Sequence, residues 1–322
     1  MRLADEVMRL ARSQPEIGLT AHRPVVQILE AIGARGAIVP FLRELVTRTG
    51  EEWREDLAEN YAFAVMLAGT ARDAEGLLEL APDRVSLVRW LAVLNKRLGN
   101  RESLEPGTSE ATMRAEIAYT IASGMSSAGR EAESEATLAL AIRLDETHAM
   151  ANNDLGYNLA DRGERLDEAE KMLERALRGE PGNANVLDSV AWLRYKRGQL
   201  RDEVGSDGKV IREGAITMLK RAIDADEDGD NAIMRDHLGD ALWRAGDKEQ
   251  AVQLWREASA MIAPTMAILA ERKDDPSLTV KVIRQVAESL RSKLAAVQAN
   301  AEPEIAPLAG EKASAKSPEP KP

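Results

Sequence analysis

The chain contains no cysteine, few aromatic residues and no long apolar run. Of its 322 residues, 3% are Phe, Trp or Tyr and none is Cys. Without cysteine the chain forms no disulfide, offers no thiolate zinc site and has no cysteine nucleophile. No run approaches the ~18 consecutive apolar residues that a membrane span needs. The charged N-terminal sequence MRLADEVMRLARSQPE does not have the form of a secretory signal.

The motifs of enzymes and of nucleic-acid-binding proteins are also missing. Acidic residues outnumber basic ones, 54 to 43, and the net charge is −11. Proteins that bind nucleic acid usually concentrate Lys and Arg on one face, so we expect no nucleic-acid partner. The three histidines, His22, His148 and His237, do not have the spacing of metal ligands. With no phosphate-binding loop and no catalytic constellation, we expect neither an enzyme nor a cofactor.

What the sequence does contain is a helical repeat. Alanine, leucine, arginine and glutamate, all strong helix formers, dominate and predict an all-α protein. Small residues recur along one helical pattern, at Ala122, Gly156, Ala191 and Gly239. The first two lie 34 residues apart, as do the turn glycines Gly129 and Gly163. This period predicts stacked helical hairpins, each of which buries its apolar face only against its neighbours.

Two segments of this repeat resemble the tetratricopeptide repeat: NNDLGYNLADRG, and DHLGDALWRAGDKEQAVQLWREA. The second combines Leu-Gly, a large apolar residue, a turn glycine, Ala, a large residue and Ala in the family's order. The small residues let paired helices approach closely, the large ones fill the space between hairpins, and the glycine turns the chain. The resemblance covers residues 113–262 and implies a right-handed α-solenoid of helix–turn–helix hairpins.

The sequence divides into four predicted regions. Residues 1–105 are degenerate helical hairpins, residues 111–262 are the repeat array, and residues 264–300 form C-terminal capping helices after Pro264 ends the preceding helix. Residues 301–322, rich in Pro, Ala, Lys and Glu, are predicted to be a disordered tail, in which Ile305 and Leu308 could serve as a short docking motif. An insertion at 199–214 is predicted to be a solvated loop, either decorative or in contact with a partner.

The N-terminus leaves two interpretations open. Ala4, Met8 and Ala11 have the spacing of the second helix of a repeat, and Pro15 follows. Either Met1 lies inside a longer array, or these residues form a simple amphipathic capping helix. We expect a cytoplasmic protein in the second case, and an exported or envelope-associated one in the first.

An acidic turn also has two interpretations. Alternating carboxylates occur at Asp224, Asp226, Asp228 and Asp230. With Gly229 they match the opening of a calcium-binding loop. However, Arg235 holds the twelfth place, where such loops have a bidentate Glu, and the segment falls at an inter-repeat turn. A solvated turn, with Asp230 or Asn231 capping the next helix, is therefore favoured over a metal site.

The resemblance implies that the first helix of each hairpin lines a concave binding face. This places the following residues in or near it: Tyr119, Asn153, Tyr157, Asp188, Trp192, Tyr195, Asp236, Asp240 and Trp243. Aromatic side chains with a polar atom are effective anchors for a partner, and aspartates favour a basic one. The alternative is that Trp192 and Trp243 pack between helices.

Some members of the family grip the C-terminal carboxylate of heat-shock chaperones through Lys, Arg and Asn. The matching places here hold Asn153, Tyr157, Ser189, Ile233 and His237, and the nearby aspartates would repel an anion, so we predict against that activity. The leading functional hypothesis is a non-enzymatic protein–protein interaction scaffold that binds a peptide or protein partner. The alternative is an assembly module of a larger bacterial envelope or secretion complex.

Overall fold

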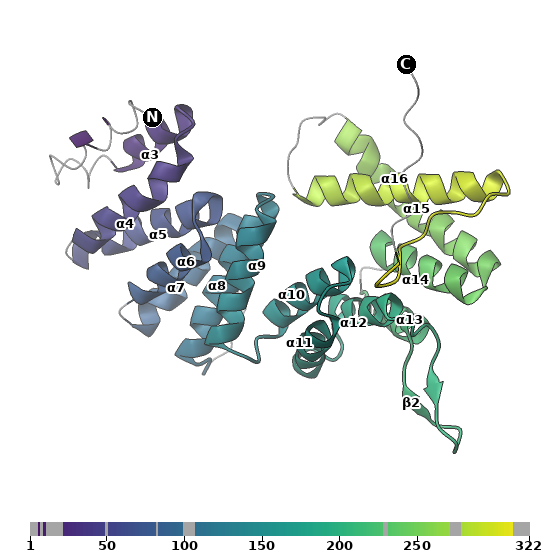
Figure 1. The fold of residues 1–322 in the computed structure, drawn as a ribbon. Coiled ribbons are helices and arrows are strands. Elements are labelled where there is room, and N and C mark those ends of the chain that lie inside the picture. Colours follow the sequence, from purple (N-terminus) through teal and green to yellow (C-terminus); the bar gives the residue numbers. More distant parts are fainter. Residues whose placement is uncertain are drawn as a thin grey trace. The chain divides into compact units, whose positions relative to one another are not determined.

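The computed structural model describes residues 6, 9–10, 22–48, 51–81, 83–98, 107–227, 231–270 and 278–311. They belong to two compact units, Met1–His148 and Ala149–Pro322. Helices dominate both units, so the predicted all-α class is confirmed (Figure 1). The division falls inside the predicted array and leaves its first hairpin in unit 1. The helix predicted from Ala4, Met8 and Ala11 lies outside the described residues.

Unit 1 is a series of antiparallel helices. Its elements are α3 (His22–Ala31), the 3-10 helix η1 (Arg35–Ala37), α4 (Ile38–Arg48), α5 (Glu51–Ala68), α6 (Ala71–Glu79), α7 (Arg84–Leu98), α8 (Glu110–Ser127) and α9 (Glu131–Leu144). Helix α5 packs against α4, α7 and α8, and α8 pairs with α9. The core side chains Tyr61, Leu77, Leu94 and Ile117 are completely buried.

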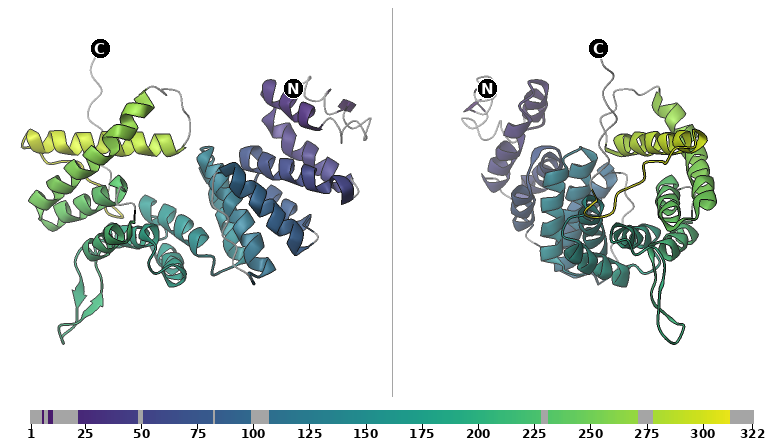
Figure 2. Two further views of the ribbon diagram at one scale, coloured as in Figure 1. Left: turned by 180° about the vertical axis from the view of Figure 1, so that it is seen from behind. Right: turned by 45° about the vertical axis from the view of Figure 1, so that its right-hand side comes forward.

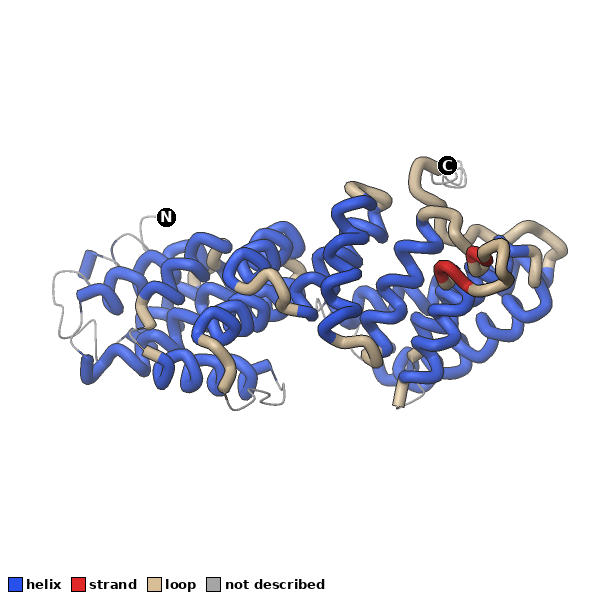
Figure 3. Tube along the Cα trace, turned by 90° about the horizontal axis from the view of Figure 1, so that it is seen from below, coloured by secondary structure: helices blue, strands red, loops and turns tan. Residues whose placement is uncertain are grey.

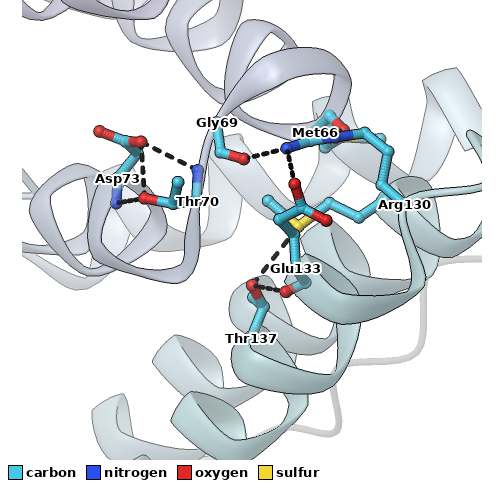
Figure 4. Close-up of polar contacts among 8 residues, drawn as sticks. Met66, Gly69, Thr70, Asp73, Arg130, Glu133 and Thr137 are labelled. Carbon is cyan, nitrogen blue, oxygen red and sulfur yellow. Dashed lines mark hydrogen bonds and ion pairs between the residues drawn. The ribbon is translucent and has the colours of Figure 1, made fainter.

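Arg130 connects the α8–α9 hairpin to the C-terminal end of α5 through hydrogen bonds (Figure 4). The Arg130 guanidinium donates to the carbonyls of Met66 and Gly69 at the end of α5, and pairs with Glu133 at 3.1 Å. The last carbonyls of a helix have no partner within the helix, so this contact satisfies them. Close by, Thr70 and Asp73 form a capping box that starts α6.

Unit 2 contains three hairpins followed by a long helix. Its elements are α10 (Ala149–Arg162), α11 (Leu166–Gly179), α12 (Ala184–Lys196), β1 (Glu203–Val204), β2 (Val210–Arg212), α13 (Ala215–Ala225), α14 (Ala232–Ala245), α15 (Lys248–Ala270) and α16 (Leu278–Gln298). Each hairpin pairs its own two helices, and the first helices of successive hairpins, α10, α12 and α14, also contact one another. Helix α16 packs on α15 and α14, as the two views of Figure 2 show.

The small residues of the repeat allow close helix pairing, as predicted. A Cβ atom at Gly156 would lie 2.9 Å from Leu173 of α11, and one at Gly239 would lie 2.4 Å from the Trp255 indole of α15. Both glycines therefore occupy the same place in their hairpins. The turn glycines have the left-handed backbone that favours glycine, with φ of +73° at Gly129, +70° at Gly163, +72° at Gly198 and +93° at Gly246.

Three segments differ from their predicted form. Pro264 lies inside α15 instead of ending it. The second half of α15 lies against α16, where Ile262, Met266 and Leu294 line a shared cleft. The 199–214 insertion is exposed as expected, but it contains a two-stranded antiparallel hairpin, drawn in red in Figure 3. Residues 301–311 of the predicted disordered tail pack on α12 and α14, while residues 312–322 lie outside the described part.

Candidate functional site

Two helices carry most of the predicted binding residues in equivalent positions. On α12 these are Asp188, Trp192 and Tyr195, and on α14 they are Asp236, Asp240 and Trp243. Both triplets have spacings of four and three residues, which place their members on one side of a helix. The side chains of Asn183 and Asn231 cap the two helices by accepting backbone N–H bonds. Asn231 is thus the helix cap that the sequence suggested.

The aspartates of these helices are paired with buried cations. Lys293 of α16 is 3% exposed, and its Nζ lies 2.7 Å from Asp236 Oδ1 and 2.6 Å from Asp240 Oδ1. The next residue of α14 after Asp236 is His237, whose Nδ1 lies 2.9 Å from Asp188 Oδ1 of α12. These pairings occupy the carboxylates that were expected to attract a basic partner.

Burial and the neighbouring carboxylates shift the pKa values of Lys293 and His237 in opposite directions. Burial alone would lower the pKa of the Lys293 ammonium, but the charges of Asp240 and Asp236 raise it. Burial likewise works against the charged form of His237, but Asp188, with Asp236 and Asp240, raises its pKa. Burial and the neighbouring Asp240 raise the pKa of Asp236. The carboxylates around Lys293 and His237 therefore favour the charged forms of both groups.

The aromatic residues pack beside these charges. The Trp192 ring stacks on His237 with 3.9 Å between centroids and on Tyr195 with 4.7 Å. Trp243 packs against Trp255 at 5.3 Å. Trp192 and Trp243 are 4% and 9% exposed, so both contribute to packing between helices. Their indole N–H groups nevertheless donate to carboxylates, Trp192 to Asp161 and Trp243 to Glu302.

The chain after α16 turns back and lies along α12 and α14 (Figure 1, yellow). We call residues 302–311 the return segment. We call the residues that bind it the α12/α14 face, and these are Tyr195, Lys196, Asp240, Trp243, Arg244 and Lys248. The last of these is the first residue of α15. The return segment has no helix or strand of its own apart from a turn near Ala309, so its backbone polar groups are free to bind the face.

Main-chain atoms make the central contacts. The Ala306 N–H donates to Asp240 Oδ2 at 3.0 Å, and its carbonyl accepts from the Tyr195 hydroxyl and from Arg244 Nη2. Farther along, the Ala309 N–H donates to the carbonyl of Lys196 at 2.8 Å. The face therefore supplies donors and acceptors that suit an extended polypeptide of many sequences.

The predicted residues thus separate into two layers. Tyr195, Asp240 and Trp243 bind the return segment directly, whereas Asp188, Trp192 and Asp236 form the layer beneath. Asn153 is 5% exposed and donates to Asp154, while burial strongly raises the pKa of the Tyr157 hydroxyl. No hydrogen bond or ion pair described above joins Asn153 or Tyr157 to the return segment.

The sequence prediction missed the cations of the site, which are Lys196, Arg244, Lys248 and Lys293. For Lys293 the sequence contained a signal. It lies three residues after Leu290 and directly before Leu294, in the apolar stripe of α16. A cation at such a position has to be paired when it is buried.

The acidic turn before α14 is only partly described. Asp228 and Asp230 lie outside the described residues, and Asp226 Oδ2 accepts the N–H of Asn231 at 3.1 Å. Within the described ranges, no group of three or more His, Asp or Glu side chains is arranged to hold a metal ion. No helix in the described part of the chain is both long and apolar enough to cross a membrane.

Comparison with known proteins gives one sequence relative and several distant structures. No protein-family model matches the chain. Over 71 residues it is 39% identical to a TPR repeat-containing protein of Pseudomonas aeruginosa, a match that spans 22% of this chain and 12% of that protein.

The solved structures are similar at low levels. MamA of Desulfovibrio magneticus RS-1 matches 65% of this chain and 99% of its own, at 16% identity and a TM-score of 0.36. Yeast Tom70 matches 91% of this chain and 65% of its own, at 13% identity and a TM-score of 0.33. These values are too low to indicate a shared function.

Proposed function

The chain carries tetratricopeptide repeats, and from this premise we propose that it is a protein-interaction scaffold whose α12/α14 face binds an extended segment of a partner protein. The function is binding, without a covalent step. The observation that carries the proposal is the recognition of main-chain atoms at Ala306, whose N–H and carbonyl are both bonded to side chains of the face. Main-chain contacts supply affinity, and the side chains beside them supply selectivity.

Side chains from two helices of the face converge on the same residue of the bound segment. Arg244 reaches the bound segment from α14, and Tyr195 reaches it from α12, so two successive hairpins act on one residue. The buried pairs of Lys293 and His237 hold the helices in place beneath them. A face that is ordered before binding loses little conformational entropy on association, which favours affinity. The basic partner suggested by the sequence remains a prediction, and the internal pairing of Asp188 and Asp236 argues against it.

A peptide selection tests this function. Random twelve-residue peptides displayed on phage are selected against the full chain, and the enriched peptides are measured by fluorescence anisotropy. The measurement uses the chain with Glu302→Lys and Glu311→Lys, in which its own return segment is repelled from the face. In this background Arg244→Met removes the donor to the bound segment's carbonyl and should weaken peptide binding about tenfold. The matched control is Lys171→Met, an exposed cation of α11, which should leave the affinity unchanged. Enriched peptides that bind the Glu302→Lys/Glu311→Lys chain equally well with and without Arg244→Met would contradict the proposed face.

A further inference from the structure

We propose that the return segment is an intramolecular ligand that closes the α12/α14 face, and that the external partner is a segment of the same chemistry. That partner would be extended, with acidic side chains near its two ends, as at Glu302, the exposed Glu304 and Glu311, and apolar or small residues between them, as at 305–310. The inference rests on the proposed function and specifies its ligand and its regulation.

The acidic ends of the return segment meet the cations of the face. The Glu302 carboxylate accepts from the Trp243 indole at 2.6 Å and from Lys248 Nζ at 3.2 Å. The Glu311 carboxylate forms two bonds of 3.1 Å with the Arg244 guanidinium. Paired donors of this kind match the geometry of a carboxylate. The indole and the ammonium lower the pKa of Glu302, and the N–H of Leu308 together with Arg244 lowers that of Glu311.

The centre of the segment, residues 305–309, contains only apolar side chains and lies close to two turns between helices. Leu308 lies 3.5 Å from the position of a Cβ atom on Gly198, and Ala309 lies 3.4 Å from that of one on Gly163. The segment thus lies directly beside the turns at Gly163 and Gly198. Pro303 is buried, and residues 305–309 are half-buried. Charged side chains at these half-buried positions would be disfavoured, which gives the face selectivity beyond its main-chain contacts.

The segment is held in a way that permits exchange. The Glu302 and Glu311 side chains are 69% and 46% exposed, and ion pairs in contact with water contribute little stability. The chain that leads from the end of α16 to Glu302 is short, so the effective concentration of the segment at the face is on the order of millimolar. A partner therefore succeeds by binding more tightly than one such segment, or by binding when the segment is released.

Binding of the segment as a separate peptide tests the proposal. The probe is a fluorescein-labelled peptide of residues 300–312, titrated into the full-length chain. In Glu302→Lys/Glu311→Lys the chain's own segment faces Lys248 and Arg244 with like charges, so the face should open. We expect the peptide to bind this variant at least about tenfold more tightly than wild type, because the internal competitor is gone. The control Glu319→Lys, outside the described residues, reverses one charge of the tail without altering the return segment and should behave as wild type.

Hydrogen exchange checks that the variant opens the face without unfolding it. The amides of Ala306 and Ala309 should be protected in wild type and exchange freely in the variant, while amides of α14 such as Leu242 stay protected. If α14 also loses protection, the milder Glu302→Gln/Glu311→Gln replaces the charge reversal, with the same order of affinities expected.

Three results would overturn the inference. Equal peptide affinity for wild type and the opened variant would mean that the segment does not compete, even though the face could still bind the selected phage peptides. No binding to the opened variant would mean that this acidic chemistry is not what the face recognises. A wild-type protein that dimerises with concentration, and loses peptide affinity as it does so, would place the segment on a second copy. The proposed function fails separately, by the Arg244→Met measurement.

Discussion

The two units contain helical hairpins of the same kind, but they bury different polar side chains between their helices. In unit 1 the buried polar side chains are Asn95, Thr120, Ser134, Thr137 and His148. In unit 2 they include Asp188, Lys196, Asp236, His237, Asp240 and Lys293. Among the described residues, every buried Asp and Lys belongs to unit 2. Unit 1 is thus held by apolar packing with a few polar ties, and unit 2 by apolar packing with a charged layer.

The position of the polar ties differs as well. In unit 1, Arg114 and Arg130 donate to carbonyls at the ends of neighbouring helices. In unit 2, Lys293 and His237 meet carboxylates midway along α12 and α14. A hydrogen bond from arginine at a helix end gives a partner to an unpaired backbone carbonyl, and the side of the helix remains available for apolar contacts. A buried charge pair on the side of a helix fixes α16 in one place and leaves Asp240 with an oxygen for the return segment.

Removing the central cation should produce the largest effect in unit 2. In Lys293→Met, Asp236 and Asp240 lose their buried partner, and breaking such a pair costs about 3–5 kcal/mol. Hydrogen exchange of α14 amides measures the loss as a lower free energy of opening. Amides of unit 1, such as those of α8, should keep theirs.

Lys281→Met is the matched control, since this lysine lies on the same helix and is exposed. Its effect should stay within about 0.5 kcal/mol, as for most surface substitutions. A small loss in Lys293→Met, close to that of the control, would remove the contrast between the charged layer of unit 2 and the apolar packing of unit 1.

The same Gly→Ala change should act with opposite sign in the two units. In Gly239→Ala the new methyl group meets the Trp255 indole, which is completely buried and bonded to Asp240, and overpacking of this kind costs about 1–3 kcal/mol. In Gly76→Ala, inside α6, the methyl group has nothing within 4 Å. Alanine there should stabilise unit 1 by about 0.5–1 kcal/mol. Chemical denaturation, monitored by hydrogen exchange of amides in each unit, measures the change in the free energy of unfolding for both variants.

A stabilising effect of Gly239→Ala would show that helices α14 and α15 do not need a glycine where they cross. The repeat period, on which the sequence prediction depends, would then have no packing basis in that hairpin.

The sequence predicted those parts of the molecule that repeat. Ala122, Gly156 and Gly239 signalled close helix pairing because any larger side chain at a helix crossing meets the partner helix, and the turn glycines signalled their positive φ angles. Such constraints are local, so they leave a periodic trace in the sequence.

The parts that do not repeat were harder to predict. Lys293 and its aspartates lie about 55 residues apart in the chain, and nothing local in the sequence shows that they pair. Residues 301–311 have the composition of a disordered tail, and they are ordered by Tyr195, Asp240 and Arg244, which belong to other elements. Pro264 was read as a helix end because the packing of α16 on the second half of α15 is not visible in the local sequence. Only the apolar Ile305 and Leu308 in the tail indicated docking.

The smallest effect that separates the two units concerns pH. His237 faces Asp188 from α12 and Asp236 and Asp240 on its own helix, with Lys293 of α16 beyond them. Its pKa in the folded chain is raised above that of the unfolded chain, so its contribution to stability is complete below about pH 6.5 and is lost as pH rises through the raised folded value. Since a single proton is involved, stability should fall by at most about 1.4 kcal/mol per pH unit in that window.

In His237→Gln this loss is absent, whereas the titration of Asp236 and Lys293 is common to both proteins. Thermal melts between pH 6 and 9, with α14 and α8 followed separately by hydrogen exchange, should show a steeper decline for α14 in wild type than in the variant, and no difference for α8. Because burial disfavours the charged form of His237 and Asp188 favours it, the direction of the slope decides which of the two prevails. If wild type becomes more stable relative to the variant as pH rises, burial outweighs the carboxylates, and the charged layer that distinguishes unit 2 does not include this histidine.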